Sequence, residues 1–216
     1  MSEGVHTDVL IMGGGLAGLT LAIQLRREVP GASVRVLERN RHPVPEGAFK
    51  IGESTVEIGA HYFETVLGLK DHLEQCQLRK FGFRFFFSEG REDLNNTVEL
   101  GVSRVFPTPS YQLDRGIFEN YLAKHAAELG VDFIDGATVG GFDCAEDDSP
   151  HRVRYRIDGS EHTASARWLI DASGGRALLK RKLDLAESSS HDANAVWFRI
   201  GERIRIDDWF DDAQWS

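Results

Sequence analysis

The fold of this chain is decided by the stretch Thr7-Asp8-Val9-Leu10-Ile11-Met12-Gly13-Gly14-Gly15-Leu16-Ala17-Gly18-Leu19. An apolar strand leads into Gly-x-Gly-x-x-Gly, and an apolar helix follows it. In such a turn Gly13 permits a sharp change of direction, Gly15 lets the backbone approach a pyrophosphate, and Gly18 packs the helix against the strand. The free N–H groups at the start of the helix, around Leu16 and Ala17, favour bound phosphate together with the helix dipole. We therefore predict a dinucleotide-binding turn.

A second strand follows at 33–37 and ends at Glu38, twenty residues after Gly18. At about this distance a carboxylate accepts hydrogen bonds from the adenosine ribose of a bound dinucleotide. The glycine pattern alone is weak evidence in a chain with 22 glycines, but the strand, turn, helix and terminal acid together make it specific. We predict that Glu38 binds the ribose. The loop arginines Arg39 and Arg41 either contact the adenine or pyrophosphate side or are solvated.

Composition and charge limit the class of protein. The 216 residues are 41% hydrophobic and 27% charged, which suits one large globular domain, or a domain and a fragment. A net charge of −9 disfavours a nucleic-acid partner and an anionic membrane surface. Cys76 and Cys144 suggest neither a metal site nor a disulfide framework, and we expect no metal. Because the sequence has no basic leader and no apolar run near ~18 residues, we expect a cytoplasmic protein without membrane contact.

Periodicity and turn residues predict the remaining elements. They are a loop over 39–47, a helix over 55–67, an aromatic strand over 81–87 that pairs with 97–104, a helix over 114–129, a strand over 131–134, a hairpin of 152–157 and 161–166 around Asp158-Gly159, a buried strand over 168–171, a helix over 177–183 and a strand over 195–200. The phenylalanines of 81–87 form either core or the wall of a substrate site. Three aromatic residues near the end, Trp209, Phe210 and Trp215, lack predicted partners, so we expect a piece of a longer protein.

Three motifs in this order resemble the FAD-dependent monooxygenases of the p-hydroxybenzoate hydroxylase type. They are the glycine turn with its terminal acid, the helix start Tyr111-Gln112-Leu113-Asp114-Arg115, and the strand end Asp171-Ala172-Ser173-Gly174. The resemblance implies an α/β fold, a three-layer Rossmann-like FAD-binding domain with the start of a β-rich substrate domain. It also implies that Arg115, Asp171 and Gly174 approach FAD. The residues themselves equally permit an ion pair of Arg115 with Asp114 or Glu119, and a turn-forming Asp171.

Within that class, Phe49-Lys50-Ile51-Gly52-Glu53-Ser54-Thr55 is similar to the loop of flavin-dependent halogenases that runs along the flavin, with Lys50 in place of the first glycine. The resemblance implies that Gly52, Glu53 and Ser54 contact the cofactor. From the residues alone, a carboxylate that caps the following helix is as good an interpretation of Glu53.

A second segment, Leu78-Arg79-Lys80-Phe81-Gly82-Phe83, resembles the catalytic-lysine segment of the halogenases. The resemblance implies that Lys80 presents electrophilic halogen to an electron-rich ring. An ammonium group at the head of an aromatic strand is partly desolvated, which fixes its donor direction, although an ordinary solvated lysine fits the spacing as well. The Trp-x-Trp-x-Ile-Pro signature of the halogenases does not occur in the sequence, and Val196-Trp197-Phe198-Arg199 differs from it.

The resemblance implies the following organisation and activity. Residues 1–79 and 111–190 form a discontinuous FAD-binding domain, and 80–110 and 191–216 supply strands of a partial substrate domain. The protein is expected to be a halogenase-like monooxygenase that uses O₂, and FAD reduced by a separate flavin reductase, on a small aromatic or other electron-rich substrate.

Three other hypotheses about the function stay open. One is a single-component hydroxylase or a geranylgeranyl-reductase-like enzyme, the second is an FAD-binding fragment without turnover, and the third is a nicotinamide-binding Rossmann domain. Hydroxylases of the p-hydroxybenzoate type usually carry Asp-Gly in the later motif, so Asp171-Ala172-Ser173-Gly174 favours the halogenase and reductase side.

Overall fold

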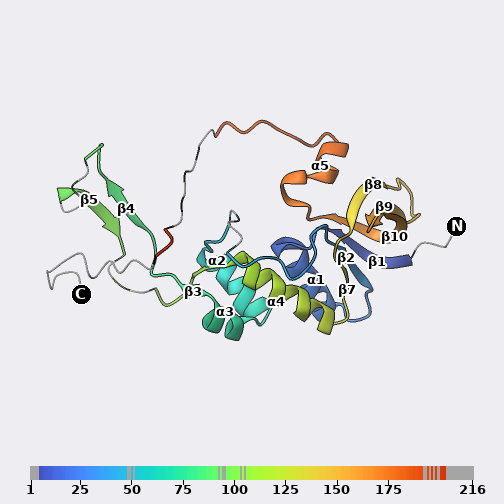
Figure 1. The fold of residues 1–216 in the computed structure, drawn as a ribbon, viewed down its shortest axis with the longest axis horizontal. Helices are drawn as coiled ribbons and strands as arrows, with labels where there is room; N and C mark the ends of the chain where they lie inside the picture. Colours follow the sequence, from blue (N-terminus) through green and yellow to red (C-terminus); the bar gives the residue numbers. More distant parts are fainter. Residues whose placement is uncertain are drawn as a thin grey trace.

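The computed structural model describes residues 5–47, 50, 52–91, 93, 96–102, 104, 106–191, 194, 196, 198 and 200–202. Half of the residues of the strand predicted over 195–200, and all three terminal aromatic residues, lie outside these ranges. The largest sheet has six strands in the order β7-β2-β1-β10-β9-β8 and lies at one end of the molecule, on the right of Figure 1. No helix among the described residues is both long and apolar enough to cross a lipid bilayer.

The first half of the sheet is parallel and follows the predicted strand–helix–strand order. Its elements are β1 (Val5–Met12), α1 (Leu16–Glu28), β2 (Val34–Leu37), α4 (Arg115–Glu128) and β7 (Asp132–Ile134). Helix α4 begins where the sequence predicted, because the Asp114 side chain accepts hydrogen bonds from the N–H groups of Gly116 and Ile117. These elements confirm the predicted α/β, Rossmann-like architecture.

Alternation along β1 produces two apolar layers, one on each face of the sheet. Val9 and Ile11 face the layer of α1 and α4, whereas Leu10 and Met12 face a second core formed with the antiparallel strands. Leu10, Ile11 and Met12 are fully buried. Both faces of this part of the strand are therefore covered, which explains why the second half of β1, from Val9 to Met12, is continuously apolar.

The second half of the sheet is an antiparallel meander of β8 (Thr138–Asp143), β9 (His151–Ile157) and β10 (Ser160–Asp171). The hairpin turn at Asp158 and Gly159 is confirmed, with φ of 48° and 82°. Strand β8 was not among the predicted elements, because two adjacent glycines at its register shift, Gly140 and Gly141, hide the alternation of side chains.

The prediction of a separate, buried strand over 168–171 is wrong. These residues are the last part of the 12-residue strand β10, and the Trp168 side chain is 61% exposed. The strand is continuous because β10 pairs along its length: 160–166 pair with β9, and 164–166 and 168–171 pair with β1. Apolar composition alone indicates a strand, but burial depends on what covers its face.

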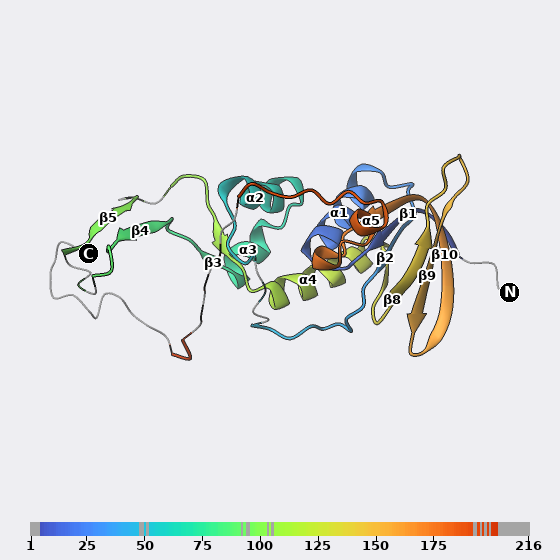
Figure 2. The ribbon, with the colours of Figure 1, turned by 90° about the horizontal axis from the view of Figure 1, so that it is seen from above.

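The helix predicted over 55–67 appears as α2 (Glu57–His61) followed by one π-helical turn (Tyr62–Val66). A further helix, α3 (Lys70–Cys76), completes a group of short helices beside α4 (Figure 2). The His72 ring stacks on Tyr121 of α4 with centroids 3.9 Å apart, and burial lowers the pKa of this imidazole.

The buried histidine leads to a prediction about acid stability. Because the folded chain protonates His72 at a lower pH than the unfolded chain does, the unfolded state binds more protons below the ordinary pKa of about 6.5. The free energy of unfolding should therefore fall as the pH is lowered through and below that ordinary pKa. In thermal unfolding at pH 7.5 and 5.5, His72→Phe should lose less stability than the unaltered chain. An equal loss of thermal stability in both proteins would contradict this role of His72. The control is His61→Gln, which changes a histidine at an exposed position.

A two-stranded ribbon of β4 (Arg84–Phe87) and β5 (Val98–Gly101) lies away from the six-stranded sheet in both views (Figures 1 and 2). It is joined to the body by β3 (Leu78–Arg79), which pairs with β6 (Tyr111–Gln112). The predicted aromatic strand is thus confirmed only over β4. The phenylalanines at positions 81, 83, 85, 86 and 87 are all exposed, so they are not core in the described part of the chain.

Candidate functional site

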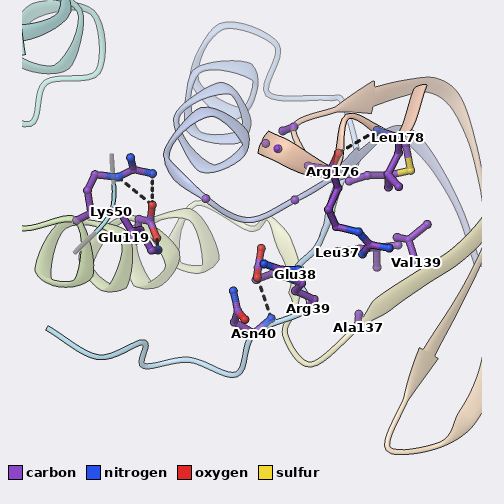
Figure 3. Close-up of a pocket in the computed structure, with 18 residues that line it drawn as sticks. Leu37, Glu38, Arg39, Asn40, Lys50, Glu119, Ala137, Val139, Arg176 and Leu178 are labelled. Carbon is purple, nitrogen blue, oxygen red and sulfur yellow. Dashed lines mark hydrogen bonds and ion pairs between the residues drawn. The ribbon is translucent and has the colours of Figure 1, made fainter. Parts of the chain in front are cut away.

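A cavity of about 260 Å³ lies where β1, β2 and β10 end and α1 begins. This is the carboxyl edge of the parallel strands, where open α/β sheets bind ligands. Figure 3 shows Glu38, Arg39 and Asn40 near the glycine turn, and Lys50 with Glu119 further along, over α4. A cavity below the usual ~300–1,000 Å³ of ligand sites can enclose only part of a dinucleotide.

The glycines of the turn have three different roles. Gly13 has a φ of 118°, and a Cβ there would lie 2.2 Å from the carbonyl oxygen of Ala172. At Gly18 a Cβ would lie 1.9 Å from the carbonyl oxygen of Gly13, so helix and strand touch at that point as predicted. Among the described residues beyond its chain neighbours, a Cβ on Gly15 would meet only the Oε1 of Glu119, at 3.7 Å. Gly13 and Gly15 line the cavity, whereas Gly18 does not.

Helix α1 offers an open N-terminus to the cavity. Gly15 is its N-cap residue and provides no side-chain hydrogen bond, and the first turn, with Leu16 and Ala17, contains no acidic residue. A phosphate would therefore meet N–H groups without competition from a neighbouring carboxylate of the same helix.

Glu38 lies beside the turn, 7% exposed, with its carboxylate fixed by the backbone. One oxygen accepts a hydrogen bond from Gly14 N at 2.7 Å, and the other accepts one from Asn40 N at 2.8 Å. This approach requires glycine at position 14, because a Cβ there would lie 2.7 Å from the Cβ of Glu38. Each carboxylate oxygen keeps further acceptor capacity for a ribose hydroxyl.

The two loop arginines separate in the structure. Arg39 lines the cavity, as does Arg176, whose position the sequence analysis did not identify. Arg41 instead donates to Asp135 and to Asp158, at 3.0 and 2.6 Å. It therefore ties the loop after β2 to the meander on the far side of the sheet, rather than to the cavity.

The later motif reaches the cavity through its backbone. Ser173 and Gly174 line the cavity, and Gly174 has a φ of 60°. The Asp171 carboxylate accepts hydrogen bonds from Ser173 N at 3.0 Å and from Leu179 N at 2.8 Å, which lowers its pKa despite burial. Asp171 thus shapes the turn and caps the next helix, α5 (Leu178–Lys182). Its direct contact with a cofactor stays a prediction.

At the other end of the cavity, Arg115 and Lys50 converge on one carboxylate. Glu119, 2% exposed, is paired with Arg115 one helical turn away, and the Nε of Arg115 lies 3.0 Å from its Oε1. Its Oε2 is paired with the Lys50 ammonium. Glu119 entered the sequence analysis only as one ion-pair partner of Arg115, and nothing in the sequence joins it to Lys50.

The loop over 52–55 lies at the junction with the ribbon. Gly52 has a φ of 85°, and Glu53 lines a separate hollow between α3 and β6. The Lys80 ammonium donates to Ser54 Oγ and to the carbonyl oxygen of Thr55, both at 2.7 Å. Lys80 does not line the cavity described above.

Comparison with known proteins is consistent with this geometry. The sequence profile of the FAD binding domain family matches residues 6–216. The chain is 24% identical over 222 residues to the flavin-dependent halogenase chlA of Dictyostelium discoideum, covering 90% of this chain and 36% of that protein. It is 28% identical over 191 residues to aklavinone 12-hydroxylase DnrF of Streptomyces peucetius, covering 82% and 37%. The chain therefore spans less than two fifths of either relative.

A solved structure shows the same fold. The myxobacterial chondrochloren halogenase CndH, described as a variant of FAD-dependent halogenases, superimposes with a TM-score of 0.65 at 29% sequence identity. The match covers 80% of this chain and 38% of that structure. The open cradle at Gly15, the acid at the end of β2 and the open N-terminus of α1 all suit the ADP half of such a cofactor.

Proposed function

The chain belongs to the FAD binding domain family, and from this premise we propose that it is the FAD-binding part of a halogenase-like monooxygenase. The relatives place it among FAD-dependent oxidoreductases that include halogenases and hydroxylases. The observation that carries the narrower proposal is Lys80, held by the 52–55 loop at the foot of an aromatic ribbon. The substrate we propose is a small, electron-rich aromatic ring.

The ADP half of FAD is assigned to the cavity at the glycine turn. Glu38 accepts hydrogen bonds from the adenosine ribose, and Arg39 and Gly174 border the same end. The N–H groups of Leu16 and Ala17, in the first turn of α1, would bind the pyrophosphate, and Arg115 and Lys50 add positive charge at the cavity. Gly52, Glu53 and Ser54, none of which lines this cavity, would hold the flavin end of the cofactor. The cavity itself can enclose only part of a dinucleotide.

When bound and reduced, FAD supplies two electrons to O₂, and the oxidant so formed converts halide to hypohalous acid. Lys80 donates a hydrogen bond to the oxygen of that acid and directs its halogen to the substrate ring. The oxygen–halogen bond breaks as the carbon–halogen bond forms, and the departing hydroxide leaves as water with the proton of the ring. Two contacts at 2.7 Å restrict the ammonium, and the ring centroid of Phe83 lies 4.4 Å from it. One N–H direction of the ammonium is left for the reagent.

The remaining parts of the proposal concern domains and partners. Residues 1–79 and 111–190 form the FAD-binding domain, and 80–110 and 191–216 begin the substrate domain. The exposed apolar side chains of the ribbon support this division, because a two-stranded ribbon is only marginally stable alone. Reduced FAD comes from a separate flavin reductase, so NADH alone should not bleach FAD bound to the protein.

Lys80→Met should abolish halogenation and leave FAD binding unchanged. The protein, supplied with reduced FAD, O₂, bromide and an electron-rich phenol, would be analysed for brominated product by mass spectrometry. We expect a loss of about 100-fold or more, because a positioned proton donor typically contributes 10²–10⁴-fold. The control is Lys70→Met, which removes an exposed lysine of α3 that pairs with Glu74 at 3.7 Å.

Two outcomes would count against this assignment. If Lys80→Met brominates as fast as the unaltered protein, Lys80 has no catalytic role. A product that gains oxygen instead, at the same rate with and without bromide, would identify a hydroxylase, the activity named for the Streptomyces relative.

A further inference from the structure

Glu119 places a negative charge where a bound pyrophosphate would add more. Its carboxylate lines the cavity, is 2% exposed, and lies where a Cβ on Gly15 would be 3.7 Å from its Oε1. Gly15 is also the N-cap residue of α1, so the carboxylate lies close to the N–H groups proposed to hold phosphate. A carboxylate repels a phosphate that is bound nearby, so the position of Glu119 requires an explanation.

Glu119 is paired with two cationic side chains, which explains its position. Arg115 is 14% exposed and Lys50 is 34% exposed, and both are paired with this single buried carboxylate. Without it, two cations and the positive end of α1 would face one another across a partly dehydrated cavity. Removing one member of a buried ion pair leaves an uncompensated charge and is strongly destabilising.

We propose that Glu119 is the internal counter-ion of the pyrophosphate subsite. Without cofactor it neutralises Arg115 and Lys50 and keeps both at the cavity, and with cofactor it shares them with the pyrophosphate. This inference rests on the placement of FAD proposed above. Glu119 is thus a positioning residue that limits affinity for the phosphates while it stabilises the cofactor-free chain.

Glu119 is proposed to stabilise the cofactor-free chain and to weaken its affinity for phosphates. Removing its charge should therefore change stability and affinity in opposite directions, which can be tested. Glu119→Gln keeps the length of the side chain and one oxygen acceptor for Arg115, but removes the charge. The cofactor-free variant should unfold at a lower temperature than the unaltered chain. It should bind ADP more tightly, by about three- to tenfold, because one repulsive charge beside the pyrophosphate is gone.

The probes are ADP and adenosine, titrated calorimetrically into each protein. Adenosine carries no phosphate, so its affinity should not change in Glu119→Gln, and the difference isolates the phosphate subsite. Glu128→Gln is the matched control, because it removes the same charge from the same helix at an exposed pair with Lys124. It should alter neither affinity.

Each other outcome overturns the proposal. If Glu119→Gln binds ADP equally or more weakly, its charge does not oppose the phosphates, and its role is to hold structure alone. If adenosine tightens as much as ADP, the effect is not on the phosphate subsite. If the unaltered chain binds no ADP, there is no pyrophosphate subsite to balance. The bromination test is independent of these results, since Lys80 does not line this cavity.

Discussion

Gly18→Ala is expected to destabilise the chain by about 3 kcal/mol or more, the upper range for forcing an atom into a packed site. The new Cβ would lie 1.9 Å from the carbonyl oxygen of Gly13 and 3.2 Å from the Cγ2 of Ile11. The first of these neighbours is backbone of the turn itself, so the overlap is relieved only by moving α1 away from β1. Thermal unfolding followed by circular dichroism measures the effect.

Gly15→Ala is the matched control for that change. Its backbone, with φ of −79°, accepts any residue, and its new Cβ would make only the 3.7 Å contact with Glu119. The fold should therefore survive, whereas the methyl group enters the cavity and weakens FAD binding by about tenfold or more. If Gly18→Ala unfolds within about 2 °C of the unaltered chain, the predicted helix–strand contact is not critical.

Glu38→Ala is expected to weaken FAD binding by about 100-fold. Hydrogen bonds to a charged group contribute roughly 1.5–3 kcal/mol each, so the loss of two ribose hydroxyl contacts corresponds to a factor of this size. Quenching of flavin fluorescence gives the dissociation constant. Glu38→Gln keeps one oxygen acceptor, and its affinity should lie between those of the other two proteins.

FMN provides the control ligand for Glu38. It lacks the adenosine ribose, so its affinity should be similar in Glu38→Ala and in the unaltered chain. An equal fall for FMN and FAD would mean that the substitution acts through the turn, where Glu38 also accepts hydrogen bonds from Gly14 and Asn40. The ribose assignment would then be wrong.

Local sequence determined most elements of this chain. The glycine turn, the Asp114 cap of α4 and the Asp158-Gly159 hairpin each depend on neighbouring residues, so each was predictable. The same reasoning failed for β8, because Gly140 and Gly141 have no side chains to alternate. Local patterns therefore indicate an element only where side chains carry the signal.

The tertiary structure alone decided burial and the charge arrangement of the site. Trp168 is 61% exposed although it belongs to an apolar part of β10, and no pattern within the strand reports that. Glu119 meets Lys50 across 69 positions of sequence, and Asp171 caps a helix rather than facing the cavity. The dinucleotide-binding turn follows from local sequence, because its glycines act on adjacent backbone. The contacts of Glu119 depend on how distant segments pack, and only the folded chain brings those segments together.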